Sequence, residues 1–168
     1  VHGGVDKELR TQSARYLSGL AFDGYGIGGS VGKDRAEMHE MLSHTAPQLP
    51  DDKPIHLLGI GDISSLEIAV PLGIDTFDSS HPTKCARHGL LFTRFGTIRL
   101  TRTIHATDFV PVEKGCPCYT CQNYTLAYLH HLFKAHELTY YTLASIHNIS
   151  YMMRLMARYR ELIFDNQV

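Results

Sequence analysis

In some stretches of the first half, apolar residues recur with the period of a helix. In others, they form short continuous runs. The helical spacing predicts helices over residues 9–20, 33–44 and 63–72. The first would have Leu9, Tyr16, Leu17 and Leu20 on its apolar face, and Asp34 would lie at the start of the second. The apolar runs predict strands over residues 21–29, 55–61 and 73–78. Strands that alternate with helices in this way predict an α/β fold with a parallel sheet.

The second half follows a different pattern. Two runs at 90–94 and 97–101 surround Phe95-Gly96, which predicts a β-hairpin. From Gln122 onward the spacing is mostly helical. The last helix carries an apolar stripe that we expect to lie in the core: Met152, Leu155, Met156, Tyr159, Leu162 and Ile163.

Length and composition predict one globular domain over residues 1–168. The chain is 43% hydrophobic and 20% charged, and it contains no internal repeat. It has no apolar run near the roughly 18 residues of a membrane span and no signal peptide, so we expect a cytoplasmic protein without a membrane partner. Because the chain begins with Val1 rather than Met, we also expect it to be part of a longer protein; the alternative is a complete protein whose initiator Met was removed.

The net charge of -1 conceals an asymmetry between the two halves. Residues 1–78 hold 6 Lys/Arg and 12 Asp/Glu, whereas residues 79–168 hold 10 and 5. Residues 84–103 contain no acid and five basic residues, namely Lys84, Arg87, Arg94, Arg99 and Arg102. These five are candidates for RNA contacts, and a solvated charged face is the alternative.

Three cysteines lie within six residues, at Cys116, Cys118 and Cys121. Three thiolates and one imidazole complete a tetrahedral structural zinc site, so we expect Zn²⁺ here. Together with Cys85, two disulfides are arithmetically possible, but the close spacing and the expected compartment disfavour them. We expect His147 to be the fourth ligand, at a break between two helices; the competing candidates are His130, His131 and His136.

Asp78 ends the third predicted strand, where barrel folds place their active-site residues. Asp75 lies two residues earlier, nearer the strand interior or on its other face, so Asp78 is the better catalytic candidate. The alternative for Asp78 is a loop-capping aspartate. The basic stretch that follows favours the catalytic interpretation, because it would place the Asp78 carboxylate beside a surface that binds a polyanion.

A glycine-rich loop spans residues 26–32. It lacks the Lys-Ser/Thr ending of a phosphate-binding loop, and its spacing does not match the dinucleotide fingerprint. We therefore expect its glycines to let a flat ligand lie against bare backbone.

Several motifs together resemble the tRNA-guanine transglycosylases, also called queuine tRNA-ribosyltransferases. The resemblance covers nearly the whole chain and is carried by Phe22-Asp23-Gly24-Tyr25 with Gly28-Gly29, Leu49-Pro50-Asp51-Asp52-Lys53-Pro54, Gly73-Ile74-Asp75 with Phe77-Asp78, Pro82-Thr83, the Cys-x-Cys-x-x-Cys run, Tyr128-Leu129-His130-His131-Leu132 and His147-Asn148. It implies the second half of a (β/α)8 barrel with a zinc subdomain at about residues 105–150 and carboxyl-terminal helices.

The resemblance also implies a reaction, in which guanine at the tRNA wobble position is replaced by a 7-deazaguanine. Asp78 would be the nucleophile, His2, Gly28, Gly29 and Ser30 would contact the base, and no redox cofactor is implied. The family's general base lies in the amino-terminal half of the barrel, so this part alone would be inactive. Family members dimerise through the region of Tyr124, Tyr128, His131 and Leu132, for which an intramolecular core is the alternative.

Two departures from the family pattern lie near the expected base pocket. His2-Gly3 stands where the family usually has Gln-Gly, and residues 79–84 read Ser-Ser-His-Pro-Thr-Lys where it has Cys-Val-Leu-Pro-Thr-Arg. They leave a second hypothesis open, a non-catalytic zinc-containing accessory or tRNA-binding subunit. The presence of Asp78 favours the enzyme.

Overall fold

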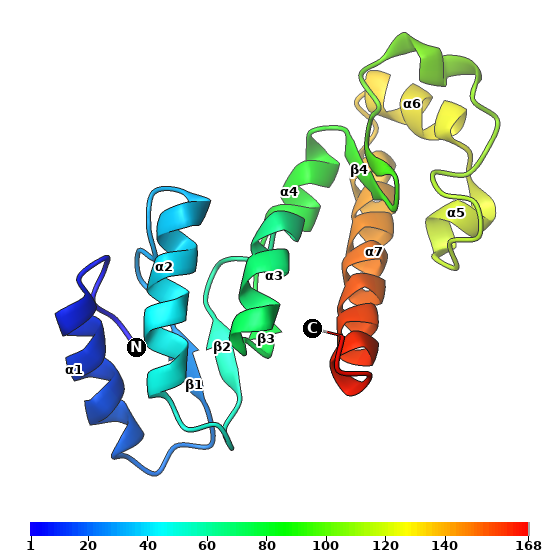
Figure 1. Ribbon diagram of the computed structural model, residues 1–168. Helices are drawn as coiled ribbons and strands as arrows, with labels where there is room; N and C mark the ends of the chain where they lie inside the picture. The colour runs from blue at the N-terminus through cyan, green and yellow to red at the C-terminus, as the bar shows by residue number, and fades with distance from the viewer. Residues whose placement is uncertain (168) are drawn as a thin grey trace. The chain divides into compact units, whose positions relative to one another are not determined.

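The computed structural model describes residues 1–167, which divide into two compact units. The first unit covers residues 1–80 and the second residues 81–167, and Figure 1 labels their elements. The single domain expected over residues 1–168 remains a prediction.

The first unit contains three short parallel strands with helices between them. Its elements are α1 (Lys7–Ser18), β1 (Tyr25–Ile27), α2 (Arg35–Thr45), η1 (Ala46–Gln48), β2 (Ile55–Leu57), α3 (Ile63–Ala69), η2 (Val70–Leu72) and β3 (Thr76–Phe77). The strand order β1-β2-β3 confirms the predicted parallel sheet, although each strand is shorter than predicted.

Aspartate side chains start the three α-helices of this unit. Asp6, Asp34 and Asp62 each lie in extended backbone and accept a hydrogen bond from an amide of the first helical turn. A short acidic acceptor at this position satisfies amides that have no partner within the helix. The helix starts therefore follow from local sequence, and the predicted start beside Asp34 is confirmed.

The core of the first unit lies between the sheet and its helices, and Ile27, Leu42 and Leu57 are fully buried in it. Helix α1 contributes differently from its predicted apolar face. Arg10 and Ala14 are its buried residues, whereas Leu9 and Tyr16 are exposed. Backbone carbonyl oxygens accept from Nε and Nη2 of this arginine, whereas Nη1 is buried without a hydrogen-bond partner.

The second unit combines a two-stranded hairpin with helices. Its elements are α4 (His81–Arg87), β4 (Leu90–Thr93), β5 (Gly96–Arg99), η3 (Thr103–Thr107), α5 (Tyr119–Asn123), α6 (Leu126–Lys134) and α7 (Leu138–Phe164). The antiparallel pairing of β4 with β5 confirms the predicted hairpin, although its turn residues are Arg94 and Phe95 instead of the predicted Phe95 and Gly96. Helix α4 was missed by the periodicity argument.

Helix α7 runs through 27 residues, so the predicted helix break at His147 is wrong. Its buried residues, from Tyr140 to Asn148, all lie in the first half. The expected core stripe farther along is half-buried at Met152 and Leu155 and 49% exposed at Ile163. The prediction that this stripe lies in the core is therefore wrong, because the elements that α7 covers meet its first half.

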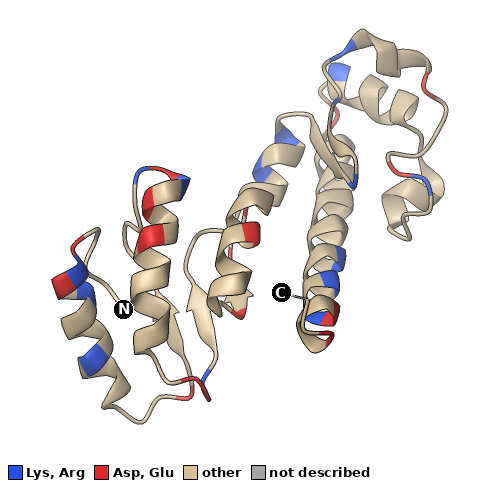
Figure 2. Ribbon diagram, in the orientation of Figure 1, with Lys and Arg blue, Asp and Glu red and all other residues tan. Residues whose placement is uncertain are grey.

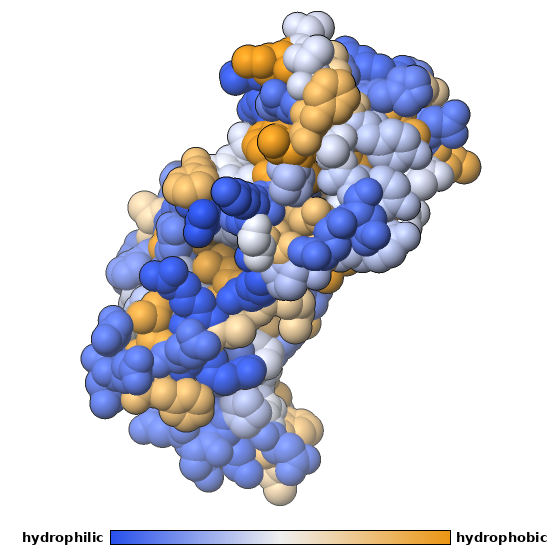
Figure 3. Space-filling model, turned by 90° about the vertical axis from the view of Figure 1, so that its right-hand side faces the viewer, coloured by the Kyte–Doolittle hydropathy of each residue, from blue (hydrophilic) through white to orange (hydrophobic). Residues whose placement is uncertain are grey.

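The two units differ in charge as the sequence indicated. Acidic residues are prominent on α2, whereas α4 and the second half of α7 carry basic residues (Figure 2). On the face drawn in Figure 3, apolar residues form separate patches among hydrophilic ones. None of the helices described in residues 1–167 is long and apolar enough to cross a membrane.

Candidate functional site

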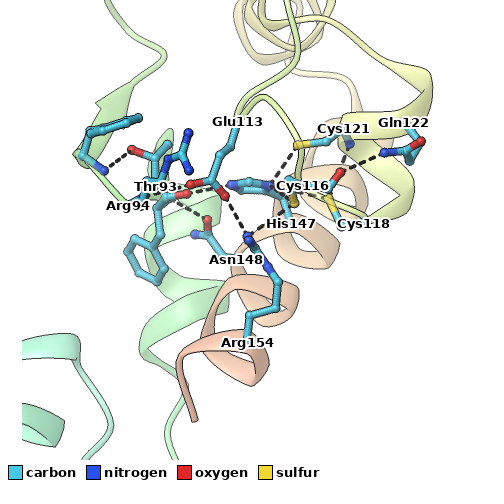
Figure 4. Close-up of polar contacts among 12 residues, drawn as sticks. Thr93, Arg94, Glu113, Cys116, Cys118, Cys121, Gln122, His147, Asn148 and Arg154 are labelled. Carbon is cyan, nitrogen blue, oxygen red and sulfur yellow. Dashed lines mark hydrogen bonds and ion pairs between the residues drawn. The ribbon is translucent and has the colours of Figure 1, made fainter. Parts of the chain in front are cut away.

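Four buried side chains of the second unit form a metal centre (Figure 4). The Nδ1 atom of His147 lies 3.3 Å from Cys121 Sγ, 3.5 Å from Cys118 Sγ and 4.0 Å from Cys116 Sγ. All four ligand atoms lie within 4.8 Å of one another. The structure thus brings together the four ligands that the sequence predicted.

Neighbouring hydrogen bonds orient these ligands. The Nε2 atom of His147 lies 2.7 Å from the carbonyl oxygen of Phe92, to which it donates, so Nδ1 faces the thiols as an acceptor. Cys118 caps α5 and receives the amide of Cys121 at 3.4 Å. Gln122 donates to the carbonyl oxygen of Cys116 at 2.9 Å. These hydrogen bonds orient the cysteine loop and the His147 ring toward one another.

Asn148 ties the metal centre to the hairpin. Its side chain accepts from the amide of Phe92 at 3.0 Å and donates to the carbonyl oxygens of Pro82 and Leu90 at 3.0 and 2.9 Å. These three bonds are buried or nearly so, and they join α7 to β4 and to the start of α4. A fully buried amide with its polar atoms satisfied stabilises one arrangement of these elements.

The donor set fits structural zinc. Three thiolates and one imidazole complete a tetrahedron and leave no open position for a reacting molecule. Burial raises the pKa of Cys118 and raises that of Cys121 to about 12, so these thiols need a cation to lose their protons. Zn²⁺ bound here would supply that charge and fix the fold.

The competing histidines lie elsewhere. His130 is buried with Nδ1 2.6 Å from the carbonyl oxygen of Leu100, and His131 and His136 are exposed. No disulfide joins the cysteines within residues 1–167, and Cys85 is half-buried on α4 with its Sγ 3.4 Å from Nε2 of His81. The preference for a metal site over disulfides is therefore confirmed.

An ion pair that the sequence did not indicate lies beside the metal centre. Arg154 Nη2 lies 2.8 Å from Glu113 Oε2 and 3.4 Å from Cys116 Sγ, and Glu113 also accepts the Arg94 amide at 2.9 Å. Burial alone would raise the pKa of Glu113, but these hydrogen bonds hold it below its usual range. No local motif joins residues 41 positions apart, so only the fold could reveal the pair.

The first unit places Asp78 directly after β3, at the carboxyl edge of the parallel sheet. Its Oδ1 atom accepts the amide of Gly59 at 2.9 Å and Nε2 of His56 at 3.0 Å. The side chain is 60% exposed. The Gly59 amide and then His56 hold the pKa of Asp78 below its usual range, so it is a carboxylate at neutral pH.

His56 is a residue that sequence reasoning missed. It pairs in register with Thr76 of the neighbouring strand, and its Nδ1 lies 2.8 Å from Thr76 Oγ1. If the Thr76 hydroxyl donates to Nδ1, the neutral imidazole carries its proton on Nε2 and donates it to Asp78. The only signal in the sequence was a histidine within a strand, which had no visible partner before the strands were paired.

Asp75 serves a different purpose from Asp78. Its Oδ2 accepts the amide of Ile55 at 2.7 Å, and its own amide donates to the carbonyl oxygen of Ile55 at 2.9 Å. Asp75 therefore joins the segment before β3 to the start of β2. This placement supports the choice of Asp78 as the candidate for chemistry.

The structure gathers the expected base-contacting residues next to the same sheet edge. A Cβ atom on Gly29 would lie 3.1 Å from Nδ1 of His2, and Gly29 has a φ of +71°. A Cβ on Gly28 would lie 2.7 Å from Leu58 Cδ1. The backbone of Gly29 and Ser30 is exposed beside the His2 ring, whereas Gly28 is buried and its amide donates to the carbonyl oxygen of Val1.

Arg10 anchors this glycine loop, which the sequence did not reveal. The buried guanidinium donates to the carbonyl oxygens of Ser30 at 2.9 Å and Gly4 at 2.6 Å, with Gly28 at 3.4 Å. One side chain thereby joins the segment at Gly4 to the loop at residues 28–30. The shape of the loop thus depends on α1 as well as on its own glycines.

The other predicted contact residues belong to the second unit. Lys84, Arg87, Arg94, Arg99 and Arg102 are all exposed. Tyr124 stacks on Tyr128 with ring centroids 5.3 Å apart, but it precedes α6 instead of lying on it. His131 is exposed and Leu132 is buried, so the four expected dimer residues do not form one exposed stripe.

A parallel β-α-β-α-β unit together with a Cys₃His centre defines an α/β protein with a structural zinc site. A family model described as "Queuine tRNA-ribosyltransferase" matches residues 1–168. The chain belongs to the queuine tRNA-ribosyltransferase family, as its motifs indicated.

Relatives with this name align along almost the entire chain. This chain is 54% identical to the queuine tRNA-ribosyltransferase of Protochlamydia amoebophila over 168 aligned residues. The alignment covers all of this chain and 43% of the relative. It is 49% identical to that of Thiobacillus denitrificans over 97% of this chain and 45% of the relative. The chain therefore spans less than half the length of the curated relatives it matches.

Proposed function

We propose that this chain is part of a cytoplasmic enzyme that replaces guanine at the tRNA wobble position with a 7-deazaguanine. The observation that carries the proposal is the carboxylate of Asp78 at the carboxyl edge of a parallel sheet, oriented by Gly59 and His56 in a chain of this family. The three strands and their intervening helices would then be part of the family's (β/α)8 barrel.

Asp78 would act as the nucleophile. Both donors contact Oδ1, which leaves Oδ2 as the more reactive oxygen toward the anomeric carbon of the ribose. The new bond joins Oδ2 to C1′ while the C1′–N9 bond breaks, and guanine leaves with the bonding electrons. The incoming base, deprotonated at N9, then attacks C1′ and releases Asp78 as a carboxylate.

Proton transfers to and from the two bases need a separate acid and base. We propose that the part of the protein outside this chain supplies them, so this chain alone should be inactive. His2 and the backbone of Gly28, Gly29 and Ser30 would read the edge of the base. An imidazole offers one donor and one acceptor where the family's usual amide offers two donors and an acceptor, so base preference should differ.

Trapping of the covalent intermediate tests this proposal. The complete protein is mixed with tRNA, denatured and analysed for a protein–RNA adduct. We expect an adduct with the native protein and none with Asp78→Asn, because an amide is not a nucleophile. Asp75→Asn is the matched control, since its remaining amide oxygen can still accept the Ile55 amide.

An adduct that persists in Asp78→Asn would mean that another residue attacks. If the native protein binds tRNA but never forms the adduct, the non-catalytic accessory subunit becomes the better assignment. The basic residues Lys84, Arg87, Arg94, Arg99 and Arg102 would contact the tRNA backbone under either assignment.

We further propose that two copies associate through the aromatic surface of Tyr124, Tyr128 and His131, with Leu132 supporting it from the core. Tyr119 meets Tyr124 edge to face, Tyr124 stacks on Tyr128, and both Tyr119 and Tyr128 are exposed. Tyr128→Ala should weaken the dimer by about 1–2 kcal/mol in sedimentation equilibrium. Tyr16→Ala, an exposed tyrosine of α1, is the control, and an equal effect or the absence of any dimer would reject the interface.

A further inference from the structure

A pocket of about 480 Å³ is formed within residues 94–158, next to the metal-binding loop. One face of α7 contributes residues three and four positions apart: Tyr151, Arg154, Leu155 and Arg158. The hairpin turn contributes Arg94, and the loop before Cys116 contributes Glu113, Lys114 and Gly115. The pocket thus has a helical wall and two walls from loops.

The pocket lining has more positive than negative charge. Its single acid, Glu113, is paired with Arg154 and accepts the Arg94 amide as well. Arg94, Lys114 and Arg158 are exposed and take part in no ion pair found within residues 1–167. Even with the net negative charge of a zinc ion held by three thiolates, cations remain in excess around the pocket.

The chemistry of these cations favours a phosphate ligand. The Arg94 guanidinium lies over the Phe95 ring at 4.7 Å, an arrangement that keeps its N–H groups available in the guanidinium plane. Lys114 from the loop and Arg158 from α7 line the same pocket, so both can contact oxygens of one phosphate. The volume lies within the range of small-molecule sites, so a phosphate can enter together with its attached nucleoside.

We propose that this pocket binds a phosphate group of an RNA backbone. The choice of RNA over a free phosphorylated molecule rests on the proposed function. Of the basic residues predicted for RNA contact, only Arg94 lines the pocket, so Lys114 and Arg158 are new members of the contact surface. They would hold the RNA beside the zinc loop, while Arg154 stays paired with Glu113.

The test compares two double variants of the zinc-loaded protein that remove equal charge. The first variant is Lys114→Gln with Arg158→Gln, which leaves the pair of Arg154 with Glu113 intact. The control is Lys134→Gln with Arg160→Gln, an exposed lysine and arginine of the same unit that do not line the pocket. Zinc content is measured for each variant to establish that the centre is retained.

Binding of a fluorescein-labelled anticodon-arm RNA hairpin is followed by anisotropy over a series of KCl concentrations. The pocket variant should bind about tenfold more weakly, with a salt slope shallower by about two, because two phosphate contacts are lost. The control should change affinity less than about twofold. Equal losses in both variants would overturn the proposal, since diffuse charge would then explain them.

The remaining outcomes separate this proposal from the proposed function. If native protein binds the hairpin and the pocket variant binds it equally well, the pocket assignment fails and the proposed function stands. If zinc-loaded native protein binds no RNA, the tRNA substrate itself is contradicted, and the pocket assignment with it. Binding of inorganic phosphate is measured in parallel by calorimetry. If the pocket variant loses phosphate binding but binds RNA unchanged, the proposal of an RNA ligand is overturned in favour of a small phosphorylated ligand.

Discussion

The metal centre of the second unit and the Asp78 site of the first are built in opposite ways. The four metal ligands are buried and converge on one point, with hydrogen bonds to Phe92 and Cys116 holding them from behind. Asp78 is 60% exposed and is held on one oxygen only. A closed centre can stabilise a fold, whereas an open carboxylate can meet a substrate.

The two sites also treat charge differently. Burial opposes the thiolate form at Cys118 and Cys121, so their ionisation depends on a bound cation. The Gly59 amide and His56 favour the carboxylate form of Asp78 without any cation. Loss of a metal ligand should therefore unfold the second unit. Loss of a hydrogen-bond donor to Asp78 should change only the pKa of that carboxyl in the first unit.

The largest expected effect follows from Cys118→Ala. Structural zinc in small domains supplies on the order of 10 kcal/mol of apparent folding free energy, so a three-ligand site should lose the ion and residues 81–167 should unfold. Hydrogen exchange should show lost protection there, with protection in residues 1–80 retained. Metal analysis should give well under one zinc per chain.

Cys85→Ala is the control for this change, since Cys85 lies on α4 and is not a metal ligand. It should keep one zinc per chain and a normal melting curve. Full zinc retention in Cys118→Ala would show that the centre does not depend on this ligand.

A smaller effect is expected in the first unit from Arg10→Met. The substitution keeps an elongated side chain in the core but leaves the carbonyl oxygens of Gly4 and Ser30 without their donor. Urea denaturation should show a loss of about 1–3 kcal/mol in the free energy of unfolding. Arg15→Met, on the exposed side of α1, should cost less than about 0.5 kcal/mol, and similar losses in both would contradict the anchoring role.

The smallest effect concerns the pH dependence of Asp78. Its folded pKa lies below the unfolded value, so its ionisation stabilises the fold above about pH 4 and this contribution is lost as pH falls through the folded pKa. His56→Ala removes one of two donors to Oδ1, and the pKa of Asp78 should rise toward its ordinary value. Any acid limb of activity should move to higher pH.

Carboxyl-detected NMR titration of Asp78 measures this shift directly. His56→Gln keeps an N–H donor and should shift the midpoint less than His56→Ala does. His39→Ala removes an exposed histidine of α2 and should leave it unchanged. Identical midpoints in native protein and His56→Ala would show that the Gly59 amide alone sets the pKa.

Local sequence determined the features that depend on neighbours along the chain. Asp34 marked a helix start, strand and helix periods gave a parallel sheet and a hairpin, and the close cysteines indicated zinc. Each of these signals lies within a few residues, because caps, periodicity and a metal-binding loop are short-range properties.

Only the tertiary structure decided the contacts that join distant residues. Strand pairing brought His56 to Asp78, helix packing brought Arg10 to the loop at Ser30, and α7 brought Arg154 to Glu113. It also placed His147 within a continuous helix instead of at a break, and left the later stripe of that helix half-buried. Periodicity identifies an apolar face but not its partner, since the depth of burial depends on which elements meet that face.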